Sequence, residues 1–121
     1  IKVLDLEIGR TGLSKREARE LGREVQEIKV EAYTKAHFYP GSQTATIKLL
    51  IEKASQKIIG AQIVGGAGAG KRIDVLALAV QLGLTPFALS EMDLSYAPPF
   101  SPVWDPVLTA ANVAAGELEK V

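Results

Sequence analysis

The sequence predicts an α+β fold in which a mostly antiparallel sheet of about four to five strands packs against helices. Three segments of alternating apolar residues follow one another between residues 28 and 63, and short turns join them. Short connections favour antiparallel neighbours. Helical patterns stand before and after this run of strands. At 121 residues the chain fits one domain, so we expect residues 1–121 to form a single domain without an internal linker.

The first predicted elements are a short strand and a helix. Residues 3–8 alternate partly in hydrophobicity and end at Gly9, which is typical of a strand. Ser14 and Glu17 have the spacing of a capping box, in which two side chains satisfy free amides at a helix start. The apolar face predicted for this helix consists of Ala18, Leu21, Val25 and Ile28.

Three strands are expected next, because apolar and polar residues alternate over residues 28–35, 47–52 and 59–63. Residues 39–42 and 54–57 form the turns between them. One face of such an antiparallel sheet is buried and the other is wetter.

The second half of the chain predicts three helices. Residues 71–83 carry apolar side chains on nearly every face, and such a helix has to be covered on more than one side. A partner subunit is a natural source of the second cover, although the sheet and the last helix can also supply it. The other two helices each begin with a capping side chain before a proline, at Thr85-Pro86 and Asp105-Pro106.

Composition argues against several classes of function. The 14 basic and 14 acidic residues cancel, so no overall field attracts nucleic acid or an anionic membrane. The longest apolar stretch, residues 75–84, is shorter than the ~20 residues that span a bilayer. The chain has no Cys and one histidine, His37, which leaves no thiolate nucleophile and too few ligands for a metal. We therefore expect no nucleic-acid partner, no membrane contact, no metal and a cytoplasmic location.

The glycine-rich segment partly matches a phosphate-binding loop. Gly65, Gly70 and Lys71 fit the pattern G-x-x-x-x-G-K between a strand and a helix. The next residue is Arg72, where that loop requires Ser or Thr to hold magnesium, and the preceding strand belongs to an antiparallel sheet. This departure argues against nucleotide hydrolysis. Two interpretations stay open: a tight turn in which glycines allow positive φ, and an anion site built from helix-start amides with Lys71 and Arg72.

A stiff loop is predicted over residues 96–106, which contain four prolines and three aromatic residues. Proline fixes φ and removes a backbone donor, so this segment is neither a helix nor a central strand. Loops on a rigid scaffold carry much of protein function, so the aromatic side chains are candidates for contact with a ligand or another subunit. The alternative is a connector whose aromatic side chains close the edge of the core.

Three segments of the sequence resemble a known family. The segments are Lys71-Arg72-Ile73-Asp74-Val75, residues 93–101 with the run Tyr-Ala-Pro-Pro-Phe-Ser, and Trp104-Asp105-Pro106-Val107. They resemble the C-terminal dimerisation domain of the FAD-dependent pyridine nucleotide-disulfide oxidoreductases, in the branch of the coenzyme A-disulfide reductases and NADH oxidases. The resemblance covers essentially the whole chain. The chain also begins with Ile1 in a strand pattern, so we expect it to be a fragment of a longer flavoenzyme.

The resemblance implies partners and cofactors that lie outside this chain. It implies a homodimer in which the FAD- and NAD(P)H-binding domains of the same polypeptide precede this domain, with the redox cysteine in the FAD domain. The parent enzyme would use FAD and NAD(P)H to reduce a small-molecule disulfide or oxygen. This fragment alone is then expected to bind no cofactor and to be inactive.

The resemblance also implies roles for individual residues. In this branch a tyrosine of the late loop lies close to the partner's flavin and redox cysteine, and Tyr96 stands at that motif. A protonated phenol can donate to a developing thiolate or a flavin peroxide, so Tyr96 is the expected catalytic residue in trans. Ala97 and Pro98 are expected near the partner's flavin. The residues expected to contact the substrate are Tyr39, Lys71 and Arg72. For Lys71 and Arg72 the alternative is a helix start stabilised by salt bridges.

One residue departs from the pattern of the branch. Coenzyme A-disulfide reductases tend to carry two adjacent tyrosines before Pro-Gly, whereas this chain has Phe38 before Tyr39. This leaves coenzyme A disulfide, another disulfide or persulfide, and oxygen open as electron acceptors. An alternative of a different class is a stand-alone interaction or phosphate-binding module that uses the glycine-rich loop 65–71.

Overall fold

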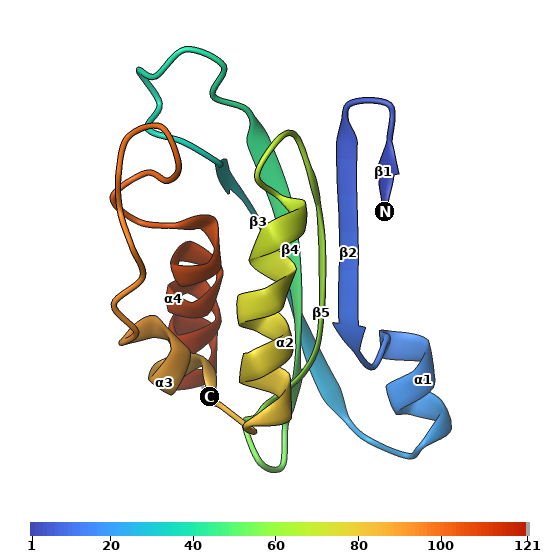
Figure 1. The fold of residues 1–121 in the computed structure, drawn as a ribbon. Coiled ribbons are helices and arrows are strands. Elements are labelled where there is room, and N and C mark those ends of the chain that lie inside the picture. The colour runs from blue at the N-terminus through green and yellow to red at the C-terminus, as the bar shows by residue number, and fades with distance from the viewer. Residues whose placement is uncertain (121) are drawn as a thin grey trace.

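The computed structural model describes residues 1–120 as a five-stranded antiparallel sheet with all helices but the first packed on one face (Figure 1). The sheet order is β1-β2-β5-β4-β3. The strands are β1 (Lys2–Val3), β2 (Leu6–Gly12), β3 (Val25–Tyr33), β4 (Thr44–Glu52) and β5 (Ile58–Gly65). The helices are α1 (Lys15–Glu20), the 3₁₀ turn η1 (Gly70–Arg72), α2 (Ile73–Gln81), α3 (Pro86–Ser90) and α4 (Pro106–Glu119). The α+β class predicted from the sequence is confirmed.

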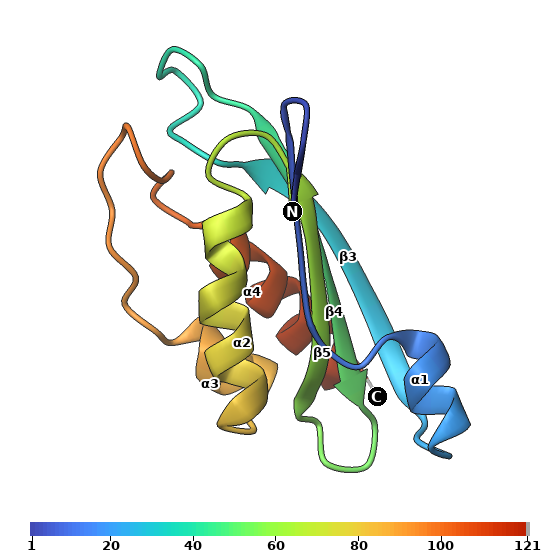
Figure 2. The same cartoon turned by 45° about the vertical axis from the view of Figure 1, so that its right-hand side comes forward.

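The core lies between the sheet and the helices α2 and α4. Strand β4 is flanked by β3 and β5, and its residues Ala45, Ile47, Leu49 and Ile51 are buried. Ile47 pairs with Ile63 of β5 and with Val30 of β3, so the period of two in each strand places the apolar side chains on one face. Figure 2 shows α2, α3 and α4 on this face, while α1 lies at the other side of the sheet. No helix among residues 1–120 is long and apolar enough to cross a bilayer.

The first predicted strand is instead a hairpin. β1 and β2 pair with each other, and Leu4 takes a positive φ of 55° in the turn between them. Gly9 does not end the strand, because β2 continues to Gly12. A Cβ atom on Gly9 would lie 2.9 Å from Cβ of Ile73, so glycine is needed here to let α2 pack closely on β2.

The first helix is shorter than its apolar pattern predicted. The capping box is confirmed, since Ser14 accepts from the amide of Glu17 and Glu17 accepts from the amide of Ser14. The helix ends at Glu20, and Gly22 has a φ of 73° that reverses the chain. The predicted helical face beyond Ala18 was therefore wrong. Leu21 is exposed, and Val25 and Ile28 belong to β3, where they pair with β4.

The later helices begin where the sequence indicated. The side chain of Thr85 accepts from the amide of Ala88 and that of Asp105 accepts from the amide of Val107, so both predicted caps are confirmed. On α2 the sheet covers one side only. Leu76 and Ala79 are buried there, and the opposite side exposes Leu78 and Leu82.

Candidate functional site

The segment from residue 91 to residue 105, here named the aromatic loop, joins α3 to α4 without regular structure. Its large side chains face solvent: Tyr96 is 49% exposed, Phe100 78% and Trp104 62%. The alternative that these side chains close the edge of the core is therefore wrong. Exposed aromatic side chains on a structured loop are typical of contact surfaces.

The backbone that follows Tyr96 is held on both sides. The carbonyl of Ala97 accepts from the amides of Phe100 at 2.8 Å and Ser101 at 2.9 Å, and the carbonyl of Pro98 accepts from the amide of Ala36 at 3.2 Å. Ala97 and Pro98, the residues expected near a flavin, are partly buried by these contacts. Among residues 1–120 the hydroxyl of Tyr96 has no hydrogen-bond partner, so the phenol is available to a group from outside the chain.

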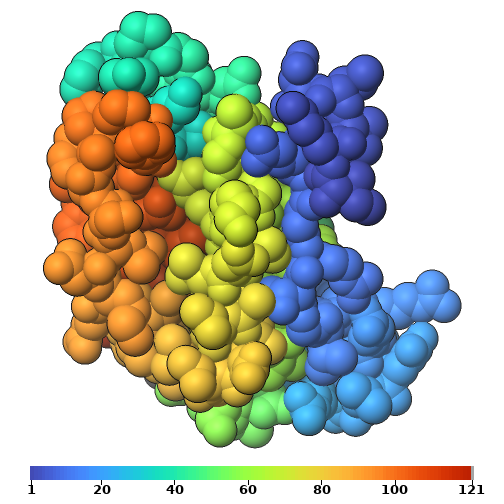
Figure 3. Space-filling model, in the orientation of Figure 1, coloured from blue at the N-terminus to red at the C-terminus, as the bar shows by residue number. Residues whose placement is uncertain are grey.

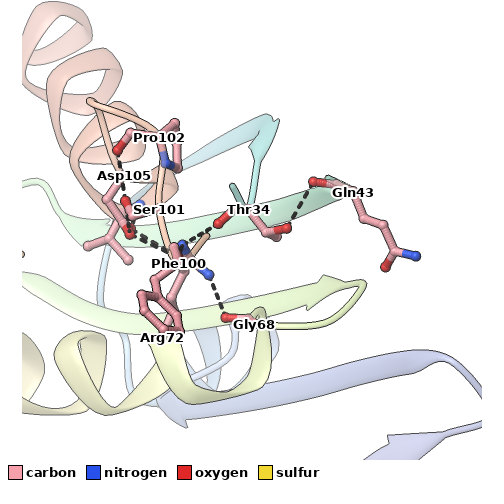
Figure 4. A network of polar contacts seen from close by, with 9 residues as sticks. Thr34, Gln43, Gly68, Arg72, Phe100, Ser101, Pro102 and Asp105 are labelled. Atoms are coloured by element: carbon pink, nitrogen blue, oxygen red, sulfur yellow. Dashed lines mark hydrogen bonds and ion pairs between the residues drawn. The ribbon is translucent and has the colours of Figure 1, made fainter. Parts of the chain in front are cut away.

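A buried group of polar contacts lies beneath the loop (Figure 4). The Arg72 guanidinium donates from Nε to both carboxylate oxygens of Asp105, at 3.2 and 3.0 Å. Its Nη1 donates to the carbonyl of Gly68 at 2.6 Å, and its Nη2 donates to the carbonyls of Thr34 at 2.7 Å and Phe100 at 3.0 Å. The five residues Thr34, Gly68, Arg72, Phe100 and Asp105 are named the Arg72 cluster.

Asp105 serves both this cluster and the helix that follows. Its carboxylate accepts from the amide of Val107 at 2.9 Å as the N-cap of α4, and from the hydroxyl of Ser101 at 3.2 Å. The sequence predicted the cap and offered salt bridges for Lys71 and Arg72, but it did not identify Asp105 as the partner of Arg72. The two partners are 33 residues apart in the sequence. The only sequence signal for this ion pair was the opposite charge of the two side chains, each at the start of a helix.

Lys71 and Arg72, both predicted to contact the substrate, point in different directions. Lys71 is exposed and pairs with Asp74 at 2.8 Å, which raises the pKa of the Lys71 ammonium. Arg72 is buried, and its donors serve the Arg72 cluster. The structure therefore does not bring the two cations together into one anion site, and Lys71 is the one that solvent reaches.

Tyr39 lies on a second loop, residues 34–43, next to the aromatic loop. The amide of Ala36 binds Pro98 across the two loops, and the space-filling view shows them side by side at one end of the molecule (Figure 3). Tyr39 is partly buried, with the Lys35 ammonium 5.9 Å from its ring centre. Phe38 is exposed. The loop that carries Tyr39 is thus hydrogen-bonded to the aromatic loop two residues beyond Tyr96.

The glycine-rich segment uses its amides within the chain. The amide of Ala67 donates to the side chain of Gln43 at 3.1 Å, and the amide of Gly70 donates to the carboxylate of Glu7 at 2.8 Å. A carboxylate already stands where a phosphate would bind, and two anions repel each other. This geometry favours the tight turn over the anion site. Among residues 1–120 there is also no group of three potential metal ligands.

Comparison with protein families and curated proteins gives a consistent result. The family described as the pyridine nucleotide-disulphide oxidoreductase dimerisation domain matches residues 1–106. The NAD(P)H sulfur oxidoreductase (CoA-dependent) of Pyrococcus furiosus is 41% identical over 112 residues, which are 93% of this chain and 25% of that protein. The coenzyme A disulfide reductase of Staphylococcus epidermidis is 36% identical over 101 residues, 84% of this chain and 23% of that protein. The chain spans about a quarter of the length of such relatives.

Solved structures agree with this match. The NAD-dependent persulfide reductase from A. fulgidus has a TM-score of 0.95 at 41% identity, over 98% of this chain and 22% of that one. The reduced CoADR-RHD of Bacillus anthracis has a TM-score of 0.94 at 38% identity, over 98% of this chain and 21% of that one. The likeness therefore extends to the loops as well as to the sheet and helices.

Proposed function

Because the chain belongs to the family of pyridine nucleotide-disulphide oxidoreductase dimerisation domains, we propose that it joins two subunits of an FAD- and NAD(P)H-dependent oxidoreductase. In this proposal residues 1–121 form one dimerisation domain of a longer polypeptide. The aromatic loop reaches the active site of the partner subunit. The observation that carries the proposal is the half-exposed side chain of Tyr96. The backbone directly after it, at Ala97 and Pro98, is held by hydrogen bonds from the amides of Phe100, Ser101 and Ala36.

The cofactors belong to other domains of the polypeptide. The amides of the glycine-rich segment that could cradle a phosphate are bound to Gln43 and Glu7, so this chain does not fit a dinucleotide by itself. Bound FAD would take a hydride from NAD(P)H and pass two electrons to the acceptor. This chain can approach such a flavin only from outside, and Tyr96, Ala97 and Pro98 are the residues proposed to do so.

Tyr96 is proposed to supply a hydrogen bond or a proton when a disulfide is reduced. Cleavage of an S–S bond by two electrons leaves two thiolates, and two protons are needed to form two thiols. A tyrosine hydroxyl is a hydrogen-bond donor at neutral pH and can stabilise or protonate one thiolate as it forms. Solvent water can restore the proton afterwards.

The acceptor is proposed to be a small anionic disulfide or persulfide, with oxygen as the alternative. The names of the relatives support this class, since they act on coenzyme A disulfide, sulfur or persulfide. On the chain itself, Lys71 is exposed near one end of α2, and Lys35 lies beside Tyr39. These cations can attract an anionic substrate towards the loops. Arg72 is not assigned this role, because its donors are bound inside the chain.

The test is a Tyr96→Phe variant of the full-length enzyme. We expect turnover with a disulfide acceptor to fall about 10- to 100-fold, because one proton donor is lost. The rate of flavin reduction by NAD(P)H should not change, since that step does not use the phenol. Tyr33→Phe is the matched control, because Tyr33 packs on His37 at the end of β3. Unaltered turnover in Tyr96→Phe would contradict the proposed role.

A further inference from the structure

We propose that Arg72 is the positioning residue of the aromatic loop and sets the direction in which Tyr96 is presented. The inference rests on the proposed function of Tyr96 and extends it to a buried residue that touches neither substrate nor cofactor. It replaces the expectation that Arg72 binds the substrate with a role exerted through the loop.

The first argument is the set of segments that one side chain joins. Arg72 stands on η1, directly before α2, which packs on the sheet. Its donors reach Thr34 just after β3, Gly68 in the glycine-rich turn, and two points of the aromatic loop, Phe100 and Asp105. The loop after β3, the glycine-rich turn and the aromatic loop therefore share one guanidinium as their common contact (Figure 4).

The second argument is how little else holds the second half of the loop. Phe100, Val103 and Trp104 are exposed, so burial of apolar side chains does not fix this part of the chain. The loop is also free of regular hydrogen-bonded structure. Besides the Arg72 cluster, the amide of Ala36 bonds to Pro98 and the Asp105 carboxylate caps α4 through the amide of Val107. Within the loop, Ala97 accepts from Phe100 and Ser101, and Ser101 donates to Asp105. Loss of the guanidinium contacts should therefore increase the mobility of the loop more than that of the core.

The third argument is the shape that these contacts require. The side chains of Arg72 and Asp105 are only 10% and 11% exposed, and their contacts need donors that diverge in one plane. A guanidinium has five donors in a fixed fork, whereas an ammonium is a single point charge with three. A lysine at this position keeps the charge and can satisfy only part of the cluster. The Arg72→Lys variant thus tests the geometry of the guanidinium hydrogen bonds while the positive charge is kept.

The experiment uses the full-length flavoenzyme and two readouts on Arg72→Lys. Hydrogen exchange followed by mass spectrometry should show at least about tenfold faster exchange in peptides that cover residues 97–105, because contacts of this segment are lost. Turnover with the disulfide acceptor should fall about tenfold or more, since a misplacement near 1 Å can cost about a hundredfold. Flavin reduction by NAD(P)H should keep its rate, which a general loss of folding would not allow.

Two further variants test whether the effect comes from the ion pair of Arg72 rather than from any Arg→Lys change. Asp105→Asn keeps an oxygen to cap α4 and removes the ion pair, so it should speed exchange in the same peptides. Arg10→Lys is the matched control, because Arg10 makes an exposed pair with Glu17 on the other side of the chain. We expect it to change neither exchange in the loop nor turnover.

The double variant with Tyr96→Phe decides whether Arg72 acts through that residue. If it does, Arg72→Lys should lower turnover by less than about twofold in the Tyr96→Phe background, because coupled sites are not additive. Fully additive losses, or exchange in the loop that does not change, would overturn the inference. If Tyr96→Phe alone keeps full turnover, the proposed function fails, while positioning of the loop by Arg72 is still decided by the exchange rates.

Discussion

Adjacent residues of the same charge can have unrelated roles, and Lys71 and Arg72 are an example. Lys71 reaches solvent and pairs with Asp74, a contact that exposed side chains make at little gain in stability. Arg72 is buried against Asp105, and removal of one partner would leave an uncompensated charge inside the protein. Sequence similarity at such a motif therefore has to be interpreted one residue at a time.

At the same scale, the lack of a side chain at Gly9 allows α2 to pack closely on β2. We expect Gly9→Ala to destabilise the chain by about 1–3 kcal/mol, because the new methyl group would meet Cβ of Ile73, an atom held by the backbone of α2. Gly116→Ala is the matched control. Apart from the adjoining backbone of α4, no atom of residues 1–120 would lie within 4 Å of a Cβ atom on Gly116, so this change should stabilise the helix by about 0.5–1 kcal/mol. Urea unfolding of both variants measures the difference; equal effects in the same direction would contradict the account of Gly9.

At the scale of the element, helix α1 is set by its two ends. The capping box at Ser14 and Glu17 satisfies amides at the start, and Gly22 reverses the chain after the end. The apolar spacing that suggested a longer helix continues into β3, where pairing with β4 provides nine residue pairs. Two strands that bury a shared face are stabilised by more contacts than one further helical turn would make.

The capping box predicts a pH dependence. The hydrogen bond from Arg10, followed by those from Ser14, holds the pKa of Glu17 below its ordinary value of 4.5. A carboxyl whose pKa is lower in the folded chain stabilises it above 4.5, and this contribution is lost as the pH falls through the folded pKa. The stability advantage of the native chain over Glu17→Gln should therefore be constant near neutral pH and shrink in acid. An advantage that grows as the pH falls would contradict this sign.

At the scale of the whole molecule, the helices and loops leave apolar surface uncovered. Leu78 on α2 and Leu82, the C-cap of this helix, stand four residues apart and are 59% and 68% exposed, so they lie on one face of the helix. The nearly all-apolar sequence of this helix predicted that more than one of its sides is buried. The sheet buries only one side. A second subunit is the cover expected for the proposed homodimer.

The expected result of charging this face is loss of the dimer. The double variant Leu78→Lys with Leu82→Lys should shift the full-length enzyme towards monomer in analytical ultracentrifugation, because burial of two unpaired cations is strongly unfavourable. Leu21→Lys is the control, since Leu21 is equally exposed but follows α1 on the other side of the sheet. If the double variant keeps the dimer at micromolar concentration, α2 does not lie in the interface.

Much of the fold follows from local patterns. The alternation in β4 and β5 and the caps at Ser14, Thr85 and Asp105 each depend on neighbours within a few residues, and all of them are confirmed. The hairpin at Leu4 and the early end of α1 were missed. A turn of two residues leaves almost no periodic signal, and the spacing of one helix face can overlap that of a following strand.

The sequence by itself determined the fold class, the family and the absence of helix or strand in the aromatic loop, because these depend on residue types and short-range order. Only the tertiary structure decided which side chains of the candidate site face outwards. Tyr96 is half exposed, whereas Arg72 is buried. Arg72 lies inside because it pairs with Asp105, which is 33 residues away in the sequence. A contact between such distant residues is decided by how the sheet, α2 and the loop pack together, and no local pattern records that packing.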